Sequence, residues 1–119
     1  MEINTHKIND FEITEVTAST TIINNIEDGL DLLGNLYYQG FDRIIIYEKN
    51  ITRDFFNLKN GMAGEILQIF SNYRIRLIIV GDFNYTSQSL KDFIYESNNG
   101  KQVNFLPTIT AALNKFSNL

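Results

Sequence analysis

Two unbroken apolar runs constrain this chain more than any other feature of its sequence. They are Ile44-Ile45-Ile46-Tyr47 and Leu77-Ile78-Ile79-Val80. A strand with one wet face alternates apolar and polar residues, whereas a continuous run is typical of a parallel sheet with helices on both faces. A helical pattern from Met62 to about Tyr73 separates the two runs. We therefore predict two adjacent, parallel, fully buried central strands joined by a right-handed crossover.

The rest of the chain completes a small mixed sheet. Residues 2–7 and 11–14 alternate like the arms of a hairpin, and Asn9-Asp10 supplies the turn because Asn and Asp tolerate positive φ. The other predicted elements are a short strand over 20–23, a loose helical turn over 51–56, an edge strand over 103–105, and helices over about 25–39, 87–97 and 108–116. The fold class is therefore α/β. A single domain over residues 1–119 has an N-terminal hairpin followed by β-α-β-α-β-α units with parallel central strands.

Helical spacing also predicts which side chains face the core. They are Ile26, Leu30, Leu33 and Tyr37 in the first helix, and Met62, Ile66, Ile69, Phe70 and Tyr73 in the second. Spacings of three and four residues place each set on one side of its helix.

Composition excludes several classes of function. The chain has 119 residues, a net charge of −4, one histidine and no cysteine. An acidic chain lacks the basic surface that neutralises nucleic-acid phosphates, and without cysteine there is no disulfide, thiolate zinc site or thiol nucleophile. The apolar runs are far shorter than the roughly 20 residues of a membrane helix, and the first residues lack the profile of a signal peptide. We expect a cytoplasmic domain without cofactor or metal, and without a nucleic-acid or membrane partner.

A set of short motifs runs through nearly the whole chain: Arg43-Ile-Ile-Ile-Tyr47, Asn50-Ile-Thr-Arg-Asp-Phe-Phe-Asn-Leu58, Gly61-Met-Ala-Gly-Glu65, Phe70-Ser-Asn-Tyr73, Ile79-Val-Gly-Asp-Phe83 and Phe93-Ile-Tyr-Glu-Ser97. These motifs resemble a bacterial family, the domain of unknown function family 4180. The order of elements is also similar to STAS-like domains, which include the anti-anti-sigma factors. That resemblance implies a regulatory domain that docks to a protein partner. The serine that is phosphorylated in many of those domains has no counterpart in Asn60-Gly-Met-Ala-Gly64.

Polar residues follow each of the two central strands. Glu48 and Asn50 come after the first, and Asp82 comes after the second. Ligands of open α/β sheets bind at the carboxyl ends of the strands, so these three residues are candidate ligand-binding residues. The two carboxylates would suit general acid–base chemistry or a hard cation. The alternative is that they only form turns and caps.

Aromatic residues are unusually frequent in the same two loops. Phe55, Phe56, Phe83 and Tyr85 offer more aromatic area than short connections need. They form either a lid over the core or an exposed surface for a partner, since aromatic side chains dominate interface energetics. Exposure decides between the two.

Two functions remain open from the sequence. The first is a non-catalytic regulatory domain that docks to a protein partner or to a second copy of itself, through the loops after Tyr47 and Val80. The second is a small-ligand-binding protein or enzyme that uses Glu48, Asn50 and Asp82. A homodimer that pairs through the edge strand 103–105 is a further alternative. His6 has no companion at a telling spacing, and we predict no catalytic residue.

Overall fold

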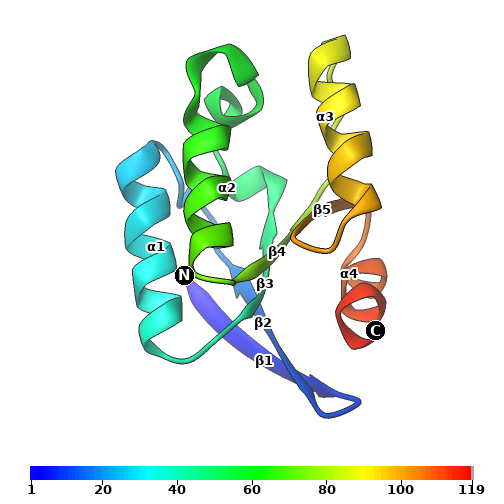
Figure 1. Cartoon of the computed structure of the whole chain (residues 1–119). Helices are drawn as coiled ribbons and strands as arrows, with labels where there is room; N and C mark the ends of the chain where they lie inside the picture. Colours follow the sequence, from blue (N-terminus) through cyan, green and yellow to red (C-terminus); the bar gives the residue numbers. More distant parts are fainter. Residues whose placement is uncertain (119) are drawn as a thin grey trace.

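The computed structural model describes residues 1–118, which form one five-stranded sheet in the order β1-β2-β3-β4-β5 (Figure 1). The strands are β1 (Glu2–Ile8), β2 (Phe11–Thr17), β3 (Arg43–Tyr47), β4 (Arg76–Val80) and β5 (Val103–Leu106). The helices are α1 (Ile26–Tyr38), α2 (Met62–Asn72), α3 (Gln88–Asn99) and α4 (Ile109–Ser117). Three short 3₁₀ turns lie between β3 and α2, at Glu48–Asn50, Arg53–Phe56 and Leu58–Asn60.

The predicted sheet is confirmed. β1 and β2 pair antiparallel, and the remaining neighbours pair parallel. The two apolar runs lie side by side, with Ile44 opposite Leu77 and Tyr47 opposite Val80. In the hairpin turn Asn9 and Asp10 have φ angles of 52° and 70°, the left-handed pair that a tight hairpin turn requires.

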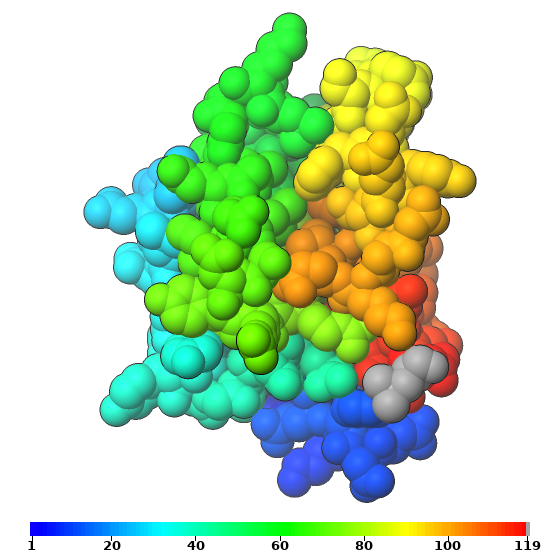
Figure 2. All heavy atoms as spheres, viewed as in Figure 1, coloured from blue at the N-terminus to red at the C-terminus, as the bar shows by residue number. Residues whose placement is uncertain are grey.

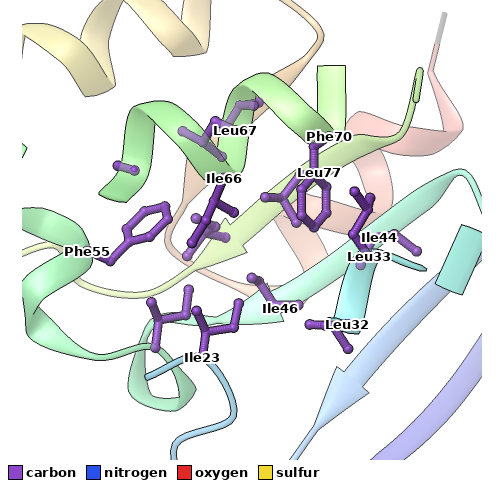
Figure 3. Close-up of a cluster of buried hydrophobic side chains, with 14 of the residues drawn as sticks. Ile23, Leu32, Leu33, Ile44, Ile46, Phe55, Ile66, Leu67, Phe70 and Leu77 are labelled. Atoms are coloured by element: carbon purple, nitrogen blue, oxygen red, sulfur yellow. The ribbon is translucent and has the colours of Figure 1, made fainter. Parts of the chain in front are cut away.

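The helices divide unequally between the two faces of the sheet. Strands β2 to β5 join the sheet in chain order, and right-handed crossovers between such strands place every connecting helix on one face. Side chains of α1 and α2 accordingly pack in one large cluster with Ile44, Ile46 and Leu77 (Figure 3). Leu90 of α3 belongs to the same cluster. Only α4 packs on the opposite face, against Ile45 and Ile78. Tyr47 lies on this less covered face and is only half-buried, so the prediction of full burial is wrong for this residue.

The predicted core faces of α1 and α2 are wrong in part. The buried residues are Gly29, Leu32, Leu33 and Leu36 in α1 and Ala63, Ile66, Leu67 and Phe70 in α2. Leu30, Tyr37 and Tyr73 are exposed. Both helices carry an apolar stripe wider than the core needs. Because Gly29 has no side chain, α1 approaches Ile66 of α2 closely on that side, and the opposite edge of each apolar stripe faces solvent.

Two smaller predictions also change. Residues 20–23 form no strand, and only an isolated bridge joins Ile23 to Ile51. The amides of Ile22 and Ile23 instead donate to the carbonyl of Asn50, so Ile23 is buried without a ladder while Thr20 and Thr21 stay exposed. The loose helical turn over 51–56 is a 3₁₀ turn over Arg53–Phe56.

Strand β5 is an edge strand, as predicted, but its edge is occupied. Asn98 donates from Nδ2 to the carbonyl of Phe105 at 3.0 Å, and its Oδ1 accepts from the amide of Phe105 at 2.7 Å. The side-chain amide thus takes the place of a neighbouring strand at this residue. Fewer free backbone N–H and C=O groups remain on this edge for a second chain to pair with.

Across residues 1–118, no helix has the length and apolar character needed to cross a membrane.

Candidate functional site

The first candidate site is a cavity at the carboxyl ends of β3 and β4, which we call the strand-end pocket. Its volume is about 660 Å³, and its walls include Glu48, Lys49, Arg53, Asp82, Asn84 and Tyr85. Two of the predicted ligand-binding residues, Glu48 and Asp82, therefore line one cavity. Carboxylates and cations are present together, which suits a polar ligand of mixed charge better than an apolar one.

Glu48 already has partners within the protein. Its Oε1 accepts hydrogen bonds from the amides of Asp82 at 3.0 Å and Phe83 at 3.1 Å. A Cβ on Gly81 would lie 2.5 Å from the Cβ of Glu48, so glycine is needed for this approach. Glu48 therefore holds the loop between β4 and α3 in place, which is the turn role left open by the sequence.

Tyr85 closes one side of the strand-end pocket. Burial, together with a hydrogen bond and the nearby charge of Glu48, raises the pKa of Tyr85 to about 12, against a smaller opposing effect of Arg53. The Arg53 guanidinium lies 5.1 Å from the centre of the Tyr85 ring. The phenol is consequently neutral at physiological pH and acts as a hydrogen-bond donor rather than a base.

Asn50, the third predicted ligand-binding residue, faces the core instead. It is 1% exposed, and its Nδ2 donates to the carbonyls of Ala18 and Thr20, each at 2.9 Å. The side chain anchors the segment after β2 to the end of β3, and it does not line the strand-end pocket.

The loop aromatics form a lid over the core. Phe55 and Phe56 are 2% and 4% exposed, and in Figure 3 Phe55 points toward the side chains of α2. Phe56 stacks on Tyr85 with the ring centres 5.1 Å apart. Four aromatics are predicted as a possible docking surface. Phe83 and Tyr85 are half-buried and keep some exposed area, whereas Phe55 and Phe56 are too deeply buried to contact a partner.

The exposed apolar surface lies elsewhere, between α1 and α2. We call it the helix groove, and it is formed by Leu30, Gly34, Tyr37, Ile69 and Tyr73 with Leu33 and Asn72. Its volume is about 510 Å³. Tyr37 and Tyr73 are 54% and 51% exposed and meet edge to face, with ring centres 4.9 Å apart. The sequence signal for this groove is the excess width of the two apolar stripes, whose residues Leu30, Tyr37 and Tyr73 are predicted to face the core but lie in solvent.

A second groove runs between α2 and α3, and Figure 2 shows it as a hollow between green and yellow-to-orange atoms. Its α2 wall is formed by Gly64, Gln68 and Ser71 together with the largely buried Leu67. It lacks the exposed aromatic side chains of the helix groove.

A polar cluster lies on the sheet face that carries α4. Glu15 on β2 accepts hydrogen bonds from His6 of β1, at 2.9 Å, and from the hydroxyl of Tyr47 on β3. Burial alone would raise the pKa of Glu15, but the hydrogen bonds from Tyr47 and His6 and the charge of His6 lower it overall. Burial and the bond to Glu15 raise the pKa of Tyr47 to about 12. His6 thus has companions that only strand pairing brings to it.

Within residues 1–118, no three carboxylate or imidazole side chains come close enough together to hold a metal ion.

Comparison with known proteins identifies the family. The family model described as a domain of unknown function (DUF4180) matches residues 8–116. The chain belongs to this family. The matched range runs from the last residue of β1 into α4, so it includes both the strand-end pocket and the helix groove. Searches of the curated proteins and of the solved structures gave no match.

Proposed function

We propose that this member of the family is a non-catalytic protein-interaction module that docks a protein partner in the helix groove. The observation that carries this proposal is the exposure of Leu30, Tyr37 and Tyr73 along one groove. A folded chain that leaves contiguous apolar and aromatic surface in water forgoes the free energy of burying it. Tyrosine is moreover among the residues that contribute most to binding energy at protein interfaces.

The arrangement of the carboxylates also supports a non-catalytic role. Glu48 is the best-placed candidate for a base, but its Oε1 accepts from two backbone amides of the next loop and the Tyr85 hydroxyl donates to the same carboxylate. A catalytic carboxylate needs a free oxygen directed at the reacting atom and a companion in a defined role. Asp82 lines the same cavity but is exposed at its rim.

The similarity to STAS-like domains, a bacterial source and a regulatory role in the cytoplasm belong to the same proposal. An N-terminal hairpin followed by alternating strands and helices supports this relationship. A second copy of the chain is the other occupant that the sequence analysis allowed.

The test is an unbiased peptide selection. A library of random peptides is selected against the immobilised domain, and each enriched peptide is then titrated against variants. We expect the enriched peptides to lose at least tenfold in affinity for Tyr37→Ala with Tyr73→Ala and to keep their affinity for Tyr95→Ala. Tyr95 is a matched control because it is an exposed tyrosine, 71% accessible, on α3. If no enriched peptide depends on the groove, the proposal is wrong.

The strand-end pocket supports a second candidate function, the binding of a small polar ligand. The observation in its favour is a cavity of about 660 Å³ with both signs of charge, at the edge where open α/β sheets bind ligands. A set of polar metabolites is screened by thermal shift. A true ligand would raise the melting temperature of the parent protein and fail to do so for Arg53→Ala and Asp82→Asn.

A further inference from the structure

The charges around the helix groove point to a particular kind of partner. Glu27 and Asp31 lie on α1, and Glu65 lies on α2; all three are exposed. One turn is 3.6 residues, so Glu27 and Asp31 lie on the side of Leu30 that faces away from α2, where Asp31 also lines a separate hollow with Ile22 and Leu32. Glu65 stands one turn before Ile69. None of the three makes an ion pair or a side-chain hydrogen bond within residues 1–118. We call these three carboxylates the acidic rim.

Glu27 and Glu65 lie in the first turns of their helices, where the partial positive charge of the N-terminus offsets part of their charge, but no basic side chain of the two helices does so. The sequences of α1 and α2 contain no lysine or arginine. Both helices also end without a basic residue in the last turn, and a helix C-terminus carries partial negative charge. Arg74 follows Tyr73 and is exposed, which reduces the negative potential at that end and leaves it concentrated at the acidic rim.

We propose that the occupant of the helix groove is a short cationic amphipathic helix of another protein, with apolar residues along one face and lysine or arginine beside them. This inference rests on the proposed function. The groove from Leu30 to Tyr37 is two helical turns long, about 10 Å, which fits two or three turns of a partner helix. An apolar floor with an acidic border matches a helix that reads i, i+3, i+4 and i+7 with basic flanks.

The same charges disfavour the other occupants. A symmetric dimer through this groove would bring the acidic rims of both copies into one interface to which α1 and α2 contribute no basic residue, so the two helices offer no charge pairing across it. An acidic peptide, a nucleic acid or an anionic membrane is repelled by the acidic rim. A two-turn contact is also small for a stable complex, so we expect a dissociation constant in the micromolar range that rises with salt.

Two synthetic peptides test the proposal. Both carry leucine at i, i+3, i+4 and i+7; one has lysine at the flanking positions and the other has glutamate. Each is labelled and titrated against the parent protein by fluorescence anisotropy at low and high salt. We expect the lysine peptide to bind at least tenfold more tightly at low salt and to shift amide resonances of α1 and α2.

A triple variant of the acidic rim and a matched control triple assign the effect. Glu27→Gln, Asp31→Asn and Glu65→Gln together should weaken the lysine peptide by roughly tenfold at low salt and remove most of its salt dependence. The matched control neutralises three carboxylates elsewhere, Asp54→Asn, Asp92→Asn and Glu96→Gln, which are also exposed. The control changes net charge equally and should leave the affinity within about twofold.

The outcomes separate this inference from the proposed function. If both peptides bind with equal affinity and both depend on Tyr37 and Tyr73, the groove is a docking site but its partner is not selected by positive charge, and the inference fails alone. If the control triple weakens binding as much as the rim triple, the attraction is that of the whole protein and the inference also fails. If neither peptide depends on the two tyrosines, both proposals fail.

Discussion

Glu48 holds the loop after β4 with one carboxylate oxygen, and Gly81 makes that contact sterically possible. Gly81→Ala would drive a methyl group into the side chain of Glu48. We expect it to lower the free energy of unfolding by about 1–3 kcal/mol, as overpacking does. Gly100→Ala is the control, since its new Cβ would meet only the Ser97 carbonyl at 3.7 Å. Urea titration measures both variants, and equal stabilities would contradict the described contact.

Tyr47 and Glu15 make the stability of the fold depend on pH. The folded pKa of Tyr47 is raised from 10.0 to about 12, so the protonated phenol is the form that the fold favours. Its contribution is complete below about pH 10 and is lost as the pH rises toward 12. We expect the unfolding free energy of the parent to fall over this range more steeply than that of Tyr47→Phe. Parallel curves for the two proteins would refute the assignment.

Glu15 makes the unfolding free energy depend on pH in the acidic range. Its pKa is lowered from 4.5, so its stabilising contribution is present above that value and is lost as the pH falls through the lower folded pKa. The difference between the parent and Glu15→Gln should therefore be largest near neutral pH and should vanish at low pH.

At the scale of elements, α1 and α2 are spaced by one glycine. A Cβ on Gly29 would lie 2.9 Å from Cδ1 of Ile66, whereas a Cβ on Gly34 would meet no atom within 4 Å. Gly29→Ala should destabilise the protein by roughly 1–3 kcal/mol. Gly34→Ala, in the same helix, should stabilise it by up to about 1 kcal/mol because alanine is the better helix former. If the helices pack as described, the melting temperature falls for Gly29→Ala and rises for Gly34→Ala. A change of the same sign in both variants would contradict the described packing.

The edge of β5 depends on α3 through Asn98. Asn98→Ala removes both hydrogen bonds to Phe105 and leaves a buried amide and carbonyl without these partners. We expect a loss of about 1–3 kcal/mol in unfolding free energy and an increase in association with protein concentration, because the edge becomes free to pair. Chemical unfolding and light scattering over a concentration series measure the two effects. Asn99→Ala, at the next and exposed position, should show neither.

At the scale of the whole molecule, buried and exposed aromatics should respond differently to truncation. Phe55→Ala opens a cavity in the core and should cost about 3–5 kcal/mol, a large share of the stability of a small domain. Tyr73→Ala, at a half-exposed position, should lose little more than its edge-to-face contact with Tyr37, about 1 kcal/mol. Calorimetry of the two variants provides the comparison. Similar losses would place the helix groove in the core and remove the basis for a docking site.

Local sequence predicted the fold well and the candidate site only in part. The runs 44–47 and 77–80 predicted the central strands correctly, because a continuous apolar run suits few other environments. Asn9-Asp10 predicted the hairpin turn for an equally local reason, the tolerance of positive φ. Glu48 and Asp82 were correctly placed at one edge of the sheet, since parallel strands end on the same side. Asn50 was not, because the direction of a side chain after a strand depends on the turn that follows.

The amino-acid sequence by itself determined the hairpin, the central and edge strands, the helices and their order along the chain. The order of the strands within the sheet, which sets the face on which three helices lie, came from the tertiary structure. Only the tertiary structure decided which edge of each apolar stripe met the sheet, and so left Leu30, Tyr37 and Tyr73 in solvent while Phe55 and Phe56 entered the core. It also brought His6, Glu15 and Tyr47 together from three strands. The physical reason is the separation along the sequence over which each effect acts. Periodicity and turn chemistry act between residues close in sequence, whereas burial depends on how helices far apart in sequence share a limited sheet surface.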